Sequence, residues 1–357
     1  MKINHNIESL VRENIRNLKP YRSARDDFDS GILLDANENS FGSPLPDNQR
    51  LNRYPMPYQL ELRQKIAAFR GVKAENVFVG AGSDEAIDLL FRIFCTPGKD
   101  RIIINPPTYG MYKVSANIND VAVDEVLLTE DFQLQPEKIL EAVKPETKLI
   151  FICSPNNPTS NSMAHEDILS VVEGFPGIVV LDEAYIDFSG QPGFSKEIDT
   201  HPNLVILQTM SKSFGLAGIR LGTAFASPEI IRYMMKVKAP YNVNQLTSEA
   251  AITAFSYLDD ITKNIKNILE EREEVIKKLV TFPEVQYVYP TDANFLLFKI
   301  KNARRVYESL AEEGVIIRYR GNEPHCEDCL RLTIGTGEEN VRFFEALKKV
   351  TAKEKYI

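Results

Sequence analysis

The segment IVVLDEAY, residues 178–185, carries the pattern that decides the fold. Four consecutive apolar residues are followed at once by a carboxylate, without the alternation of a half-exposed strand. A strand with this pattern is buried on both faces, as in a parallel sheet that helices cover. Similar apolar runs occur at 101–104, 148–152 and 204–208, and helical stretches alternate with them. The sequence therefore predicts an α/β fold with a large, mostly parallel sheet between layers of helices.

The C-terminal part of the chain has a different order of elements. After a stretch without Gly or Pro, the pattern gives strand, helix, two strands and a final helix, which is typical of a small α+β unit. We expect an N-terminal segment that packs with this small unit, a large domain, a connecting helix and the small domain, over residues 1–35, 36–243, 244–279 and 280–357.

Composition excludes several classes of protein. The chain has 357 residues, of which 43% are hydrophobic and 26% charged, and its net charge is −8. This charge argues against nucleic acid or an anionic membrane as the main partner. No apolar run is long enough to span a bilayer, and the N-terminus lacks the apolar core of a signal peptide. With only four cysteines there is no disulfide framework, so we expect a cytoplasmic protein.

The cysteines also bear on metal binding. Cys326 and Cys329 form a lone C-x-x-C pair, whereas Cys95 and Cys153 lie singly within apolar stretches. Because a structural zinc ion needs four ligands, we predict no metal site and assign no chemistry to the 326–329 loop.

Small and polar residues follow the predicted strands, at the sheet edge where ligands gather. Gly80-Ala-Gly-Ser-Asp-Glu85 opens a helix after one strand and suits an anion such as phosphate. A plain helix start capped by Ser83 is the alternative. Glu85 occupies the third glycine position of a dinucleotide fingerprint, and no P-loop signature occurs, so a nucleotide cofactor is disfavoured.

Three further loops extend this set. Ser154-Pro-Asn-Asn-Pro158 supplies two amides, Asp182 follows its strand directly, and Lys212 precedes Arg220 by eight positions. Taken one at a time, Asp182 could be a helix cap, and Lys212 and Arg220 could be surface side chains. Together they match pyridoxal 5′-phosphate (PLP), which requires an amine for its aldehyde, a carboxylate for its pyridine nitrogen and donors for its phosphate.

On these motifs the chain resembles the fold-type I PLP-dependent aminotransferases, which have the aspartate aminotransferase-like fold, and among them the histidinol-phosphate aminotransferases. The matching blocks are Leu34–Asn39, Arg53–Pro55, Gly80–Glu85, Ser154–Pro158, Asp182–Tyr185 and Ser211–Arg220. The resemblance implies transfer of the amino group between L-histidinol phosphate and 2-oxoglutarate, giving imidazole-acetol phosphate and glutamate, in histidine biosynthesis.

The resemblance also implies roles for single residues. Lys212 would be the catalytic residue, joined to PLP and moving a proton, and Asp182 would pair with the pyridine nitrogen. The remaining cofactor-binding residues would be Gly82, Ser83, Asp84, Glu85, Tyr109, Asn157, Tyr185, Thr209, Ser211 and Arg220, with Tyr54 reaching the phosphate from the partner subunit of a homodimer.

The substrate would be held by Tyr21, Asn37, Arg318 and Arg331. Two planar guanidinium groups and the hydroxyl of Tyr21 suit a phosphate dianion. Simpler explanations stay open for two of the site residues: Arg318 could face solvent, and Tyr109 could be a packed aromatic at a helix start.

Other functions also stay open. An aromatic amino-acid aminotransferase would keep the chemistry and change the substrate, and a threonine-phosphate decarboxylase of the same fold would release CO₂. A non-catalytic PLP-binding regulator is a third alternative, although no DNA-binding extension is evident. An NAD-dependent oxidoreductase would need the glycine fingerprint that this chain lacks.

Overall fold

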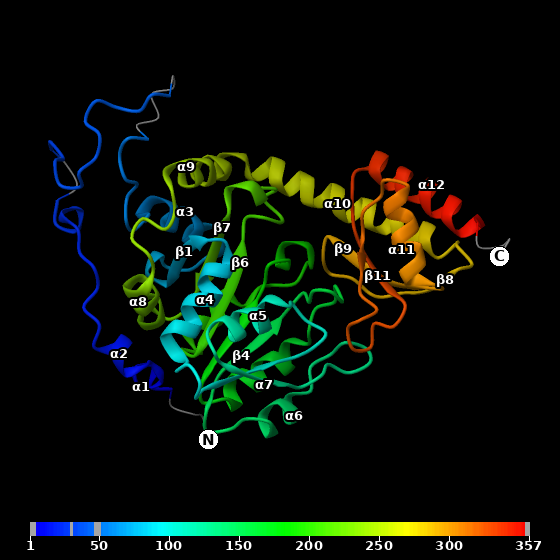
Figure 1. The fold of residues 1–357 in the computed structure, drawn as a ribbon, viewed down its shortest axis with the longest axis horizontal. Coiled ribbons are helices and arrows are strands. Elements are labelled where there is room, and N and C mark those ends of the chain that lie inside the picture. The colour runs from blue at the N-terminus through cyan, green and yellow to red at the C-terminus, as the bar shows by residue number, and fades with distance from the viewer. Residues whose placement is uncertain (1–4, 29–30, 46–50, 354–357) are drawn as a thin grey trace.

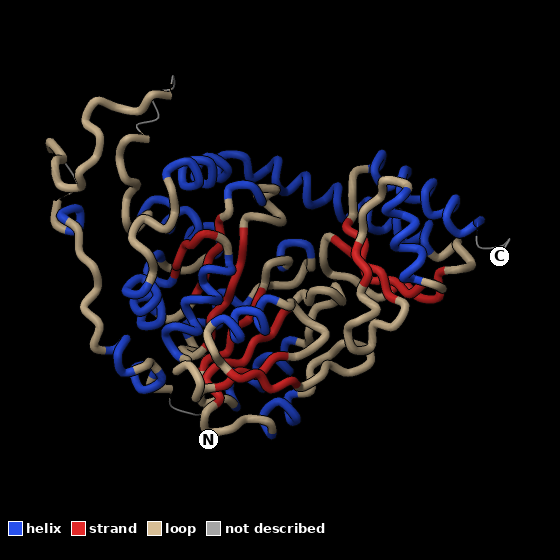
Figure 2. Tube along the Cα trace, in the orientation of Figure 1, coloured by secondary structure: helices blue, strands red, loops and turns tan. Residues whose placement is uncertain are grey.

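The computed structural model describes residues 5–28, 31–45 and 51–353, which form two sheets (Figure 1 and Figure 2). Most of their hydrophobic packing is local to each sheet, but one cluster of the large sheet continues into the small unit through Leu297, Cys326 and Cys329. The large sheet lies among the helices of the N-terminal two thirds of the chain, and the small sheet lies beside the far end of helix α10 (Leu258–Leu279). None of the described helices is both long and apolar enough to cross a membrane.

The large sheet has seven strands in the order β1-β7-β6-β5-β4-β2-β3. Adjacent strands from β3 to β6 are parallel, whereas β7 is antiparallel to both of its neighbours, so the predicted mostly parallel sheet is confirmed. The strands are β1 Val77–Ala81, β2 Arg101–Ile104, β3 Ala122–Glu125, β4 Thr147–Cys153, β5 Ile178–Asp182, β6 Leu204–Thr209 and β7 Leu221–Phe225.

Helices cover both faces of this sheet, which explains why β5 is buried along its whole length. One face packs against helices α3, α6 and α7, and the other against α4, α5 and α8. The helices of this part are α3 Leu60–Arg70, α4 Ser83–Phe94, α5 Met111–Ile118, α6 Pro136–Glu141, α7 His165–Gly174, α8 Pro228–Val237 and α9 Gln245–Ala254.

The small sheet is antiparallel, in the order β10-β11-β9-β8, and packs against α11, α12 and the last turns of α10. Its elements are β8 Val285–Val288, β9 Phe295–Ile300, α11 Ala303–Glu312, β10 Arg318–Tyr319, β11 Cys329–Thr333 and α12 Gly337–Lys353. The α+β content expected here is present, and the domain boundaries stay a prediction.

The N-terminal segment packs on the large sheet, so its predicted contact with the small unit is wrong for the helices α1 (Ile7–Leu10) and α2 (Glu13–Arg16). Ile7, Val11 and Ile15 are buried in the same core as α4 and α8. The Arg12 backbone also donates to the Ile93 carbonyl at the end of α4, at 3.0 Å. Amphipathic spacing predicted the apolar face of this segment but not the surface that it covers.

Candidate functional site

A cavity of about 600 Å³ lies at the carboxyl ends of β4, β5 and β6, and the small sheet closes its other side. Both sheets contribute side chains to it. Most of the site residues predicted from the sequence line this cavity: Ser83, Asp84, Tyr109, Asn157, Asp182, Tyr185, Thr209, Ser211, Lys212, Arg220, Arg318 and Arg331.

Asp182 is the last residue of β5, and it is 4% exposed. The hydroxyl of Tyr112 donates to its Oδ2 atom at 2.7 Å, and the Ala184 backbone N–H donates to Oδ1 at 3.0 Å. Burial raises the pKa of Asp182, although these two donors and Lys212 act in the opposite direction. A carboxylate in this position is suited to a cationic partner within the cavity.

Lys212 lies in the turn after β6, with its Nζ atom 5.5 Å from the centre of the Tyr185 ring. Burial lowers the pKa of Lys212, and the positive charges of Arg331 and Arg220 lower it further, against the opposite effect of Asp182. A lysine with a lowered pKa is more often neutral, and a neutral amine is the form that attacks a carbonyl carbon.

The start of α4 and residue Arg220 form one end of the cavity. Gly82 is the N-cap of α4 with a φ of +78°, and Arg220 also has a left-handed backbone, with a φ of +55°. A side chain at Gly222 would approach the Ser83 nitrogen to 2.0 Å, so only glycine lets β7 lie this close to the helix start. Thr209 Oγ1 donates to Ser211 Oγ at 3.0 Å nearby. A helix N-terminus, two hydroxyls and a guanidinium group fit the phosphate of PLP.

The β10–β11 hairpin supplies the opposite wall of the cavity. Arg318 pairs with Arg331 in the strand register, and Arg331 donates from Nη1 to Asn157 Oδ1 at 2.5 Å. Burial lowers the pKa of Arg331 to about 10, with the charges of Arg320 and Arg318 acting in the same direction. Arg318 is exposed, yet it lines the cavity, so it is placed to meet a ligand at the mouth.

Two residues of the site were missed from the sequence: Tyr112, which is buried behind the cavity against Asp182, and Arg320, which lines the cavity. Tyr112 lies on the buried face of α5, where an aromatic residue is expected for packing alone, and its contact with Asp182 depends on the fold. Arg320 lines the cavity directly after β10. The R-x-R spacing with Arg318 in a predicted strand was a signal that could have found it, because alternate residues of a strand share a face.

Five predicted residues do not line the cavity within one chain. Gly82 lies behind the cavity wall, and the Arg220 side chain covers it. The Glu85 carboxylate does not face the cavity; it accepts hydrogen bonds from the Ala81 backbone N–H and from Asn242. The other three come before α3: Asn37 and Tyr54 line a separate cavity of about 420 Å³, and Tyr21 is 71% exposed near Tyr58 and Tyr241.

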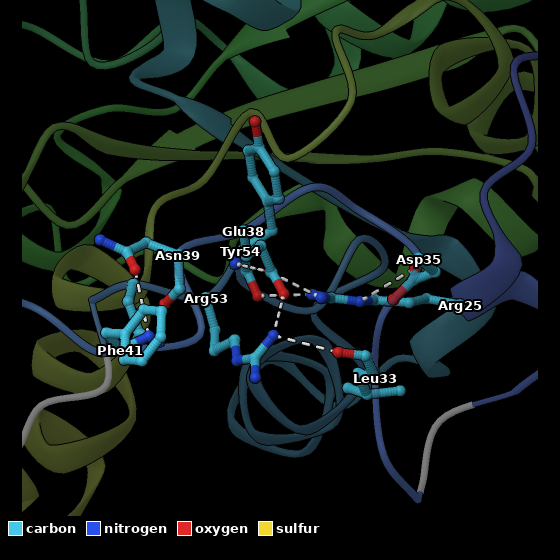
Figure 3. A network of polar contacts seen from close by, with 9 residues as sticks. Arg25, Leu33, Asp35, Glu38, Asn39, Phe41, Arg53 and Tyr54 are labelled. Atoms are coloured by element: carbon cyan, nitrogen blue, oxygen red, sulfur yellow. Dashed lines mark hydrogen bonds and ion pairs between the residues drawn. The ribbon is translucent and has the colours of Figure 1, made fainter.

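Tyr54 is held by a buried ionic network that Figure 3 shows. Glu38 accepts from Arg25 at 2.6 Å, from Arg53 at 2.7 Å and from the Tyr54 backbone N–H at 2.6 Å. Burial alone would raise the pKa of Glu38, but these three donors outweigh it and lower the pKa from 4.5 to about 2. The network therefore stabilises the fold at neutral pH, and this stabilisation is lost as the pH falls from about 4.5 through 2.

Cys326 is buried in the loop between β10 and β11, and Cys329 is buried as the first residue of β11. All four cysteines are free thiols. Across residues 5–28, 31–45 and 51–353, no three His, Cys, Asp or Glu side chains are grouped so that they could hold a metal ion.

Comparisons with known proteins agree with this geometry. Residues 29–347 match the family described as aminotransferase class I and II. A histidinol-phosphate aminotransferase from Flavobacterium johnsoniae is 52% identical over 347 residues, which cover 96% of this chain and 98% of that protein.

Solved structures give the same match. The histidinol-phosphate aminotransferase of Clostridium acetobutylicum superposes with a TM-score of 0.78 at 27% identity, over 85% of this chain and 92% of that one. The enzyme of the same name from Sinorhizobium meliloti, solved with PLP, has a TM-score of 0.80 at 23% identity, over 89% and 90% of the two chains, and supports the fold.

Proposed function

Because the chain belongs to the class I and II aminotransferase family, we propose that it is a PLP-dependent transaminase that acts on L-histidinol phosphate and 2-oxoglutarate. Its products are imidazole-acetol phosphate and glutamate, and the reaction is a step of histidine biosynthesis. The observation that carries the proposal is the meeting, in one cavity, of buried Asp182, Lys212 with its lowered pKa, and the paired arginines Arg318 and Arg331.

The cofactor supplies an electron sink for the bonding electrons released at the amino-bearing carbon of the substrate. Asp182 would bind the pyridine nitrogen, and Tyr112 and the Ala184 backbone hold its carboxylate in place for that contact. Lys212 Nζ would bind the cofactor and act as the base that accepts the proton of the reacting carbon.

The other cofactor contacts divide between the ring and the phosphate. Asn157 and Tyr185 would hydrogen-bond the ring oxygen, and Tyr109 would cover the face of the ring. The phosphate would be held by the backbone N–H groups of residues 82–85, by the hydroxyls of Thr209 and Ser211, and by Arg220.

The proposed substrate explains the charge at the far side of the cavity. Arg318 and Arg331 lie opposite one another on the hairpin and offer two guanidinium groups to one anion. Histidinol phosphate carries a phosphate ester on the carbon next to its amino-bearing carbon, and 2-oxoglutarate carries two carboxylates, so each substrate offers an anionic group that the same arginines can hold in turn. Tyr21 and Asn37 complete the substrate contacts from the N-terminal segment.

A substrate panel tests this function. The holoenzyme is mixed separately with histidinol phosphate, phenylalanine and threonine phosphate, and the visible absorbance of bound PLP is followed. We expect amino transfer at the lowest concentration with histidinol phosphate, because it offers a transferable amine and a phosphate ester for the arginine pair. Phenylalanine has no phosphate, and threonine phosphate carries a carboxylate as well. A preference for phenylalanine, or CO₂ release from threonine phosphate, would assign a different reaction to the site.

We propose further that two copies of the chain form a homodimer. Residues 31–45 expose a series of large apolar side chains, among them Ile32 at 91%, Leu34 at 78% and Phe41 at 102%. In Figure 1 this stretch, in blue, extends away from the rest of the described chain, unlike the helices α1 and α2 before it. Apolar exposure of this extent favours an interface, and a second copy is the partner that also brings Tyr54, Asn37 and Tyr21 to a site.

Mixing two defective variants tests whether the site is shared. Tyr54→Ala and Lys212→Ala proteins are each expected to have low activity. After unfolding and refolding together, half of the dimers contain one chain of each kind, and one of their two sites is intact, so about a quarter of the wild-type activity should return. Light scattering should give twice the chain mass of 40.4 kDa. A monomer, or a mixture no more active than its parts, would contradict the proposal.

A cytoplasmic location also remains part of the proposal. The free thiols of Cys95, Cys153, Cys326 and Cys329 support it, since reducing compartments keep thiols unpaired. The division into a large cofactor-binding domain (36–243), a connecting helix (244–279) and a small domain (280–357) is proposed on the two separate sheets and on the hydrophobic cluster that belongs to the small one.

A further inference from the structure

We propose that Arg320 is a specificity-determining residue, which binds the third oxygen of a substrate phosphate and so separates phosphate esters from carboxylates. The inference deepens the function proposed above and rests on it. It adds to the arginine pair a residue that the sequence alone did not indicate.

The strand pattern places three arginines on one face. Arg318 and Arg331 are directly opposite in the register of β10 and β11, so their side chains share a face of the small sheet. The Arg320 backbone N–H donates to the Cys329 carbonyl at 2.9 Å and continues this ladder by one residue. Since alternate residues point the same way, Arg320 lies on the face of Arg318. Tyr319 and Leu330 pack into the hydrophobic core on the other face.

All three guanidinium groups reach the cavity, and two of them lack a full set of partners. The Arg320 side chain is only 19% exposed, and its ion pair with Glu323 is long, with 3.8 Å between Nη1 and Oε1. Among the residues that the structure describes, the Nε atoms of Arg320 and Arg331 are buried without a hydrogen-bond acceptor. An unpaired buried donor costs stability, so an anion in the cavity that accepts from these two groups would stabilise both arginines.

The positive charges of the three arginines also favour an anion in the cavity. Burial lowers the pKa of Arg320, and the neighbouring charge of Arg318 lowers it further. Arg320 in turn is one of the charges that lower the pKa of Arg331. Three mutually repelling cations around one space are stabilised when an anion enters, and a dianion stabilises them most.

Geometry favours phosphate over carboxylate as that anion. A carboxylate has two oxygens in one plane, which two guanidinium forks can satisfy. A phosphate ester has three terminal oxygens in a tetrahedral arrangement, so it offers an acceptor to a third donor as well. Arg318 and Arg331 therefore serve both substrates, whereas Arg320 adds binding energy for the phosphate alone.

The test compares Arg320→Gln and Arg320→Lys with the wild-type holoenzyme and with Arg305→Gln, an exposed arginine of α11 in the same unit. For Arg320→Gln, kcat/KM for histidinol phosphate is expected to fall about 10- to 100-fold, mainly through KM, as one charge-assisted contact is lost. In the same variant, kcat/KM for glutamate should fall much less, and kcat/KM for phenylalanine should hardly change. Arg320→Lys should recover part of the loss, and Arg305→Gln should behave as wild type.

Inhibition by inorganic phosphate separates this inference from the proposed function. Its inhibition constant on the holoenzyme, with whichever amino donor is best, should rise about 10-fold or more in Arg320→Gln. Equal losses for every substrate, or an unchanged inhibition constant, would overturn the role of Arg320. If histidinol phosphate is not a substrate but phosphate inhibition still depends on Arg320, the anion site stands and the proposed reaction fails.

Discussion

Lys212→Ala is expected to lose about 10⁴-fold in turnover while the protein keeps its fold and still binds PLP without a covalent link. The side chain lies in the turn after β6, so its truncation removes an amine and leaves the core of the sheet intact. No other lysine lines the cavity, within the described ranges, to replace it. Steady-state kinetics measure the loss.

A covalent readout accompanies the kinetics. After borohydride reduction and denaturation, the wild-type chain should retain the mass of the cofactor, and the variant chain should not. Lys263→Ala, an exposed lysine on α10, is the matched control and should retain both mass and activity. Retained activity in Lys212→Ala, or a cofactor mass still attached to it, would remove Lys212 from the mechanism.

Asp182→Asn is expected to lower kcat by about 10³-fold, because the pyridine nitrogen loses its buried anionic partner. The amide keeps the size of the side chain and can still accept from the Ala184 backbone, so the change is mainly one of charge. Burial already raises the pKa of Asp182 in the folded chain, which means that its negative charge destabilises the cofactor-free protein at neutral pH.

The stability of the protein without PLP is the control for this experiment. Without PLP, Asp182→Asn should melt at the same temperature as the wild type or higher, whereas its activity and its affinity for PLP should fall. Tyr112→Phe removes one donor and keeps the charge, so it should lose only about 10-fold. A melting temperature that drops together with activity would instead indicate a structural role for Asp182.

The motif loops could be predicted from sequence because each follows its strand directly. Asp182 and Lys212 each lie within a few residues of an apolar run, and parallel strands bring such loops to one edge of the sheet. The antiparallel placement of β7 could not be predicted, since its residues are as apolar as those of the parallel strands. The edge strand β3 was missed because its AVDE sequence is polar and only half buried.

The contributions that sequence reasoning missed depend on tertiary contacts. Tyr112 meets Asp182 across 70 positions, and the Arg320 side chain reaches a space between two sheets. The N-terminal helices show the same limit: the spacing of Ile7, Val11 and Ile15 gives an apolar face, but which of the two cores receives it is decided by packing.

The pairing of Arg318 with Arg331 has a consequence for how such a protein can diverge. In the proposed function, one hairpin carries the cations that choose the substrate, while Asp182 and Lys212, which would perform the reaction, lie at the edge of the other sheet. Mutations in a short contiguous piece of the gene can therefore alter which compound is accepted and leave the reaction itself intact. Laboratory evolution aimed at a new amino donor would do best to confine its library to the codons of residues 318–331.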